Sequence, residues 1–122
     1  MGKSFRDLIV WQRAIDMTTC IYQLTTAFPK TEVYGLTSQM RRAAVSVASN
    51  IAEGAGRGGK KEFKQFLVMA RGSNCELQTQ LLIAAKLKMA NQDQITTAES
   101  LSHEVGKMLN GLLQSLSQPT GD

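Results

Sequence analysis

The segment "RRAAVSVASNIAEGAGRGGKKE", residues 41–62, decides the fold of this protein. Its glycines match two phosphate-binding patterns: Gly54, Gly56 and Gly59 fit G-x-G-x-x-G, and the same segment read through Lys60 fits G-x-x-x-x-G-K. In both kinds of site the glycines follow a buried strand and open a helix. The structure of the residues before Gly54 therefore separates a nucleotide-binding α/β fold from an all-α fold.

The residues before the glycines have the pattern of a helix. They are rich in alanine, and a polar residue recurs every third or fourth position. Lys61 stands where a nucleotide site needs Ser or Thr to reach magnesium. We therefore expect a helix, a turn and a second helix, with no bound ATP, GTP or NAD. In this interpretation Gly54 is the left-handed cap of the first helix, and the other glycines allow the chain to reverse.

A helical period continues on both sides of this segment and predicts four helices, at about residues 8–28, 36–53, 60–89 and 93–117, with a tail at 118–122. Ser4 and Asp7 form a capping pattern ahead of the first helix, and Pro29 stops it. The predicted apolar face of the third helix is Phe63, Phe66, Ala70, Leu77, Leu81 and Ala84. No segment alternates like a strand, and the connections are short. The prediction is an all-α, up-and-down antiparallel four-helix bundle in one domain, residues 1–122.

The composition excludes several classes of protein. A chain of 122 residues with 43% hydrophobic and 20% charged residues is typical of one globular domain. It has no apolar run long enough for a membrane span and no secretory signal, so we expect a cytoplasmic protein. Cys20 and Cys75 are far apart and are expected to be reduced. His103 is the one histidine, and Lys107 replaces the second histidine of H-E-x-x-H. We expect no metal site, no cofactor and no enzymatic activity.

Positive charge is concentrated at the start of the third helix. Residues 57–71 contain five cations and one anion, an excess equal to the net charge of +4 for the whole chain. Lys60, Lys64 and Arg71 project within about 40° of one another around a helix. The candidate nucleic-acid-binding residues are therefore Arg57, Lys60, Lys61, Lys64 and Arg71, which would contact phosphates. The alternative is a solvated charged face. Because Phe63 and Phe66 are assigned to the core, aromatic base stacking is not indicated.

A second polar feature lies on the second helix. Arg42, Ser46, Ser49 and Glu53 form one narrow stripe beside its apolar face. This stripe is either a solvated flank or a polar seam against another helix or subunit, with Glu76 as a candidate partner. Asn50 and Asn74 lie nearer the apolar faces of their helices, where a buried amide needs partners and can fix the register of packing.

Several segments resemble a known family, the four-helix-bundle proteins called ribosomal-RNA intervening-sequence proteins. They are "FRDLIVWQRAIDM", "FPKTEVYGLTSQMRRAAVSVASNIAEGAGR", "KEFKQFL" and "ARGSNCELQTQL". The resemblance extends from Phe5 to about Leu116, and "RRAAVSVASNIAEG" is its most specific part. The chain departs from the common pattern at Ala48, where proline is frequent, and at Gly59, where a serine cap is frequent.

The resemblance implies a bacterial cytosolic bundle that assembles as a ring-like homopentamer. It also implies distant kinship with the accessory protein of diversity-generating retroelements, which binds a reverse transcriptase and nucleic acid. The family has no established catalytic residues to carry over. The matching motif positions are interpreted as structural or interface residues: Arg42, Ser46, Asn50, Glu53, Gly54, Gly72, Ser73 and Glu76.

The leading hypothesis is a non-enzymatic, oligomeric binding protein. Its basic edge would contact RNA, DNA or a nucleic-acid-associated protein. The alternative is a protein-binding scaffold with no role in nucleic-acid binding, in which the cations serve solubility. Salt dependence separates these hypotheses, because phosphate contacts weaken steeply as salt rises and apolar interfaces do not.

Overall fold

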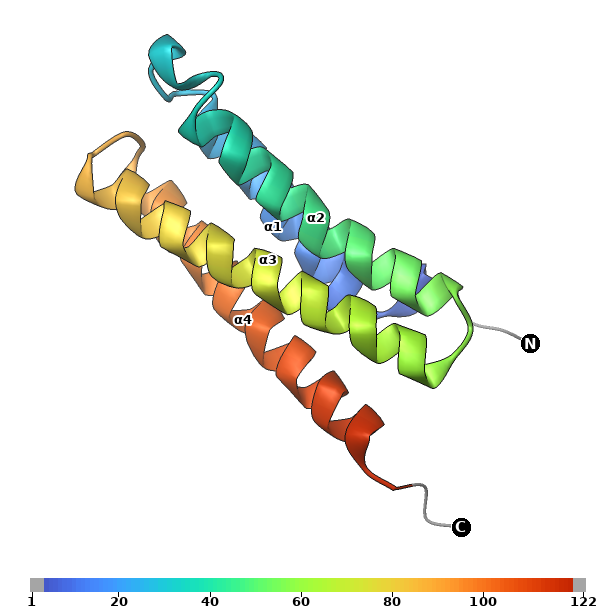
Figure 1. Ribbon diagram of the computed structural model, residues 1–122. Coiled ribbons are helices and arrows are strands. Elements are labelled where there is room, and N and C mark those ends of the chain that lie inside the picture. Colours follow the sequence, from blue (N-terminus) through green and yellow to red (C-terminus); the bar gives the residue numbers. More distant parts are fainter. Residues whose placement is uncertain (1–3, 120–122) are drawn as a thin grey trace.

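The structure, a computed structural model, describes residues 4–119 and contains four long helices (Figure 1). These are α1 (Ile9–Thr25), α2 (Leu36–Gly56), α3 (Lys60–Lys86) and α4 (Gln92–Ser117), with short 3-10 turns η1 (Phe5–Asp7) and η2 (Lys30–Glu32). Each helix packs against two others: α1 and α3 both contact α2 and α4. No strand forms within the described residues. The predicted all-α, up-and-down four-helix bundle is confirmed.

All four helices contribute to one apolar core. Its largest fully buried side chains include Met17, Ile21, Leu24, Met40, Ile51, Leu67, Leu77, Leu81, Ile95 and Leu109. On α3 the prediction was wrong at one position, because Leu67 is buried where Phe66 was expected. Phe66 is only half-buried, on the side of α3 that faces α2. Because α3 contacts both α2 and α4, its buried face is wider than one stripe and is centred away from Phe66.

The two ends of α1 differ from the prediction. Ser4 and Asp7 do form a capping box, but the box caps η1, and Leu8 is extended before α1 begins at Ile9. At its other end α1 stops at Thr25 instead of Phe28. The N–H groups of Ala27 and Phe28 bond to carbonyls three residues back, at 3.4 and 3.0 Å. The chain therefore tightens into turns before Pro29, which disfavours a helical conformation for the residue ahead of it.

The glycine-rich segment is mostly helical. Its preceding residues form α2, as predicted, and α2 continues through Gly54 to Gly56. The prediction that Gly54 is a left-handed cap was wrong, because Gly54 is a buried helical residue. A Cβ atom at Gly54 would lie 2.6 Å from the Cβ of Phe66 on α3, so glycine is needed for the close approach of the two helices. The left-handed conformation occurs at Gly58, whose φ is 84°.

The connection between α3 and α4 begins earlier than predicted. Helix α3 ends at Lys86, not near Met89, and Lys88 has a left-handed φ of 54°. The Met89 N–H donates to the Ala84 carbonyl at 3.0 Å, which closes the helix end in the manner of a Schellman motif. Helix α4 then starts after Asn91, whose side chain accepts hydrogen bonds from the N–H groups of Asp93 and Gln94.

A buried pair of polar side chains joins α3 to α4. The Asn74 amide nitrogen donates to the Ser102 carbonyl at 2.9 Å, and the Ser102 hydroxyl donates to the Asn74 amide oxygen at 2.8 Å. Both residues are buried, with 2% and 0% of their surface exposed. A slip of α4 along α3 would leave these polar atoms unpaired away from water, so the pair fixes the register of the two helices.

We predict that Gly54→Ala destabilises the protein by about 1–3 kcal/mol. The added methyl group overpacks the contact with Phe66, which outweighs the gain of up to ~1 kcal/mol in helix propensity. The matched control is Gly72→Ala in the middle of α3, where an added Cβ meets no atom within 4 Å. Urea unfolding should show this control to be neutral or stabilised. Equal effects of the two substitutions would contradict the role assigned to Gly54.

We also predict coupling between Asn74 and Ser102. Asn74→Leu alone should cost ~1–3 kcal/mol, because the buried Ser102 hydroxyl loses its partner. The double variant Asn74→Leu with Ser102→Ala should recover part of this loss, because both unsatisfied groups are then removed. The measurement is a double-mutant cycle by chemical unfolding. Strictly additive losses would show that the two side chains do not act as a pair.

Candidate nucleic-acid interface

Three of the five predicted basic residues lie together at the start of α3. Lys60, Lys61 and Lys64 surround a hollow of about 550 Å³ between the start of α3 and the end of α4. Gln65 and Val68 of α3 and Leu116 of α4 complete its lining. In Figure 1 the last turns of α4 diverge from the first turns of α3 at this end of the bundle. The cations are therefore arranged around a concave surface and not along a flat helix face.

The hollow is lined by three lysines and, among the described residues, by no acidic side chain. No ion pair within residues 4–119 includes Lys60, Lys61 or Lys64. The N-terminus of α3 lies at the same place: Gly59 provides no side-chain cap for the first N–H groups, and Glu62 is the one acid of the first turn, against Lys60 and Lys61. Backbone dipole and side-chain charges thus favour an anion at the same place.

Arg71 extends this basic surface along the seam between α3 and α4. Its guanidinium donates to the Asn110 side-chain oxygen on α4 at 3.2 Å. Lys107, one helical turn before Asn110, is exposed on α4. Lys107 was not among the predicted basic residues, because its place beside this seam follows only from the packing of α4 on α3, which brings Asn110, one turn away, to Arg71.

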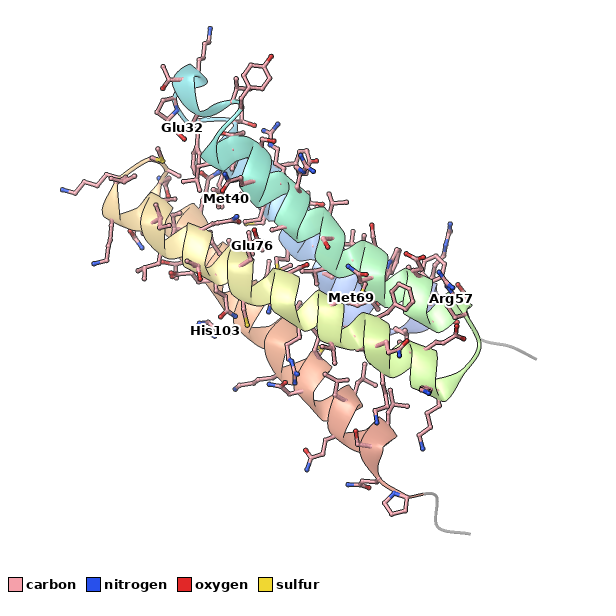
Figure 2. All side chains as sticks on the ribbon, in the orientation of Figure 1. Glu32, Met40, Arg57, Met69, Glu76 and His103 are labelled. Carbon is pink, nitrogen blue, oxygen red and sulfur yellow. The ribbon has the colours of Figure 1, made fainter. Side chains whose placement is uncertain are left out.

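Arg57 is separated from the three lysines. Its guanidinium forms an ion pair with Glu53 at 2.9 Å and lies 5.1 Å from the centre of the Phe66 ring. Figure 2 shows Arg57 at the corner where α2 meets α3. Because Phe66 is on the α2 side of α3 and the lysines border α4, the five predicted cations form two groups.

The predicted polar stripe contains a real seam, and it lies between two helices of the same chain. The hydroxyls of Ser46 on α2 and Ser73 on α3 are 2.9 Å apart. Asn50 donates to the carbonyl and the hydroxyl of Ser46, at 2.8 and 3.0 Å. These three predicted interface residues therefore join α2 to α3, and Asn50 is half-buried as its position suggested.

The other residues of the stripe point to different places. Arg42 and Glu76 line a polar hollow of about 650 Å³ between α2 and α3, together with Ser46 and Ser73. No hydrogen bond or ion pair within the described residues joins Arg42 to Glu76. Ser49 borders an apolar groove between α1 and α2, and Glu53 pairs with Arg57. The stripe therefore lies on the outer side of α2, between the α2–α3 hollow that Ser46 lines and the α1–α2 groove that Ser49 borders.

Other chemistry has little support in the described part of the chain. No three His, Cys, Asp or Glu side chains within residues 4–119 group as metal ligands. His103 projects from α4 (Figure 2) and is exposed. Cys20 and Cys75 are free thiols, and burial raises the pKa of the Cys20 thiol. Between residues 4 and 119, no helix has the length and apolar character needed to cross a membrane.

The floor of the lysine hollow could not be read from the sequence. Val68 is an exposed apolar residue near the lysines on α3, and Leu116 comes from the far end of the chain. Only the register of α4 against α3 brings them together. Lys60, Lys61 and Lys64 are visible in the sequence as neighbours on one helix, whereas Leu116 carries no local signal.

Comparisons with known proteins place the chain in a family. A solved structure of a protein with unknown function from the S23 ribosomal protein family of Bacteroides thetaiotaomicron shares the fold with a TM-score of 0.77. It is 17% identical in sequence, and the match covers 87% of this chain and 99% of the other. No curated protein matches significantly. The family model of the 23S rRNA-intervening sequence proteins matches residues 6–111, and the chain therefore belongs to this family.

Proposed function

We propose that this protein is a non-enzymatic nucleic-acid-binding protein of the cytoplasm, which contacts phosphates through Lys60, Lys61 and Lys64. Arg71 and Lys107 extend the contact along the seam between α3 and α4. The observation that carries the proposal is the convergence of three lysines, none paired with an acid within residues 4–119, on one hollow. The family name refers to an intervening sequence of 23S rRNA, which makes RNA the first probe.

The chemistry of the lysines suits phosphate better than a defined protein partner. Lysine is a flexible point charge with three donors, which can follow the irregular path of a nucleic-acid backbone. Arginine, which fixes carboxylates or bases in bidentate geometry, is absent from the hollow. Phosphate contacts position a strand and carry no base information, so binding is expected to have little sequence preference.

We predict that the double variant Lys60→Glu with Lys64→Glu binds RNA at least ~10-fold more weakly than the wild type at low salt. Each lysine–phosphate contact on a single strand contributes about 0.7 to the slope of log affinity against log salt, so losing two lowers the slope by about 1.4. Fluorescence anisotropy with a labelled RNA at several salt concentrations measures both quantities.

The matched control is Lys30→Glu with Lys88→Glu, which makes the same change in net charge at the opposite end of the bundle. Both lysines are exposed, in the connections before α2 and α4. This control should retain most of the affinity, and both variants should keep the helical content of the wild type. Equal losses in the two double variants would indicate only nonspecific attraction. Absence of RNA and DNA binding at low salt would refute the proposal and favour the protein-binding scaffold.

We further propose that the protein functions as a homo-oligomer, with a pentamer as the expected state. Support comes from the α2–α3 face, where Arg42 and Glu76 have no salt-bridge partner within residues 4–119 and Tyr34 is 94% exposed. On α3 this face continues into the exposed apolar side chains of Met69 and Ile83. Exposed apolar side chains beside charged residues that lack a salt-bridge partner are typical of a protein–protein contact surface, which a second copy of the chain can cover.

We predict that light scattering at micromolar concentration reports a pentamer for the wild type. Arg42→Glu should shift the population toward smaller species, because it places like charges on the proposed contact face. Lys30→Glu, which reverses one charge outside that face, is the control and should leave the mass unchanged. A monomeric wild type would contradict self-association, and a pentamer unaffected by Arg42→Glu would place the interface elsewhere.

A further inference from the structure

We propose that the lysine hollow receives a base of a single-stranded nucleic acid, while the adjoining phosphates lie against Lys60, Lys61 and Lys64. This inference rests on the proposed function and specifies which class of nucleic acid, single-stranded or duplex, the protein binds. It predicts that single strands are preferred over duplexes. The structural basis is an apolar floor inside a basic rim.

The floor of the hollow is aliphatic. Val68 is 46% exposed, and Leu116 packs partly against the core while its remaining surface lines the hollow. Apolar surface does not stabilise a phosphate held by three lysines, because the phosphate oxygens require hydrogen-bond donors or water. A nucleobase has an apolar face that is stabilised by contact with apolar side chains and polar edges that need hydrogen bonds. Gln65 on the rim has an amide that can donate to or accept from such an edge.

The three lysines lie within about two turns of Val68 on α3. Val68 is one turn beyond Lys64, about 6 Å along the axis of α3, and about two turns, ~10–12 Å, beyond Lys61 and Lys60. The flexible stems of the lysines can reach the phosphates that adjoin a seated base. The hollow of about 550 Å³ is open to solvent on one side, so a strand can enter without threading.

Duplex nucleic acid cannot fill this hollow without losing a base pair. Its bases are stacked and paired inside the helix, and extruding one costs a few kcal/mol. A single strand pays little of this cost, because its bases are already exposed. A duplex can still bind through phosphates alone, so the inference concerns the additional affinity of a single strand and leaves phosphate binding intact.

The test uses the full chain and four probes. These are a short mixed-sequence single-stranded RNA, the same strand with abasic sites, its duplex, and vesicles containing an anionic phospholipid. The variant is Val68→Ser, which removes apolar floor without changing charge. The matched control is Leu82→Ser: Leu82 is similarly exposed, at 52%, but lies about 21 Å farther along α3 and outside the hollow.

We expect the wild type to bind the intact single strand more tightly than the abasic strand or the duplex. Val68→Ser should weaken binding to the intact strand about fivefold, equivalent to ~1 kcal/mol, and should leave binding to the abasic strand unchanged. Leu82→Ser should behave as the wild type with every probe. Circular dichroism confirms that both variants fold.

Three other outcomes are informative in different ways. Equal wild-type affinity for all three nucleic acids, with the lysine dependence retained, overturns the base site but preserves phosphate binding as the function. Vesicle binding that requires Val68, without RNA binding, overturns both and assigns the hollow to an anionic lipid. Equal losses in Val68→Ser and Leu82→Ser also overturn the base site, because the effect is then not specific to the hollow.

Discussion

The close approach of α2 and α3 at Gly54 is the constraint on which much of the structure depends. A side chain at Gly54 would collide with the Cβ atom of Phe66, so the two helices reach their observed separation only because glycine has none. The contact anchors one end of the α2–α3 pair, beside the turn through Gly58. It fixes how α3 leaves that turn and therefore where its first lysines project.

The placement of α3 divides the basic residues between two faces. On the α2 side, Phe66 lies against Gly54, and Arg57 covers the ring while pairing with Glu53. On the α4 side, Lys60 and Lys64 border a hollow that ends at Leu116. One cationic segment of sequence thus serves two purposes: Arg57 stabilises the α2–α3 corner, and the lysines remain available for a ligand. The first purpose is structural, and the second supports the proposed binding of phosphate.

Polar side chains between the helices set their registers. Ser46, Asn50 and Ser73 form a half-buried group between α2 and α3, and Asn74 with Ser102 forms a buried pair between α3 and α4. An apolar core of interchangeable leucines and alanines tolerates small slips of one helix along another, whereas directional hydrogen bonds do not. The consecutive residues Ser73 and Asn74 therefore tie α3 to both of its neighbours. The position of Leu116 beside Val68 follows from this register.

The sequence by itself determined the helices, because helical periodicity and caps are local properties of the chain. The period of apolar residues predicted all four helices, and the segment before Gly54 was identified as helical despite the phosphate-loop pattern. The same reasoning predicted that Lys60, Lys61 and Lys64 lie together, since neighbours on one helix turn are visible in the sequence. Helix ends were less well predicted where tertiary packing competed with local signals, as at Gly54.

Only the tertiary structure decided how these surfaces combine. It placed Arg57 against Phe66 and away from the lysines, turned Ser46 and Ser49 toward different grooves, and brought Leu116 to the floor of the hollow. The physical reason is that a helix presents its residues around a full circle, and the partner that each side meets depends on the rotation and register of the neighbouring helices. Those depend on contacts between residues distant in sequence, such as Gly54 with Phe66 and Asn74 with Ser102.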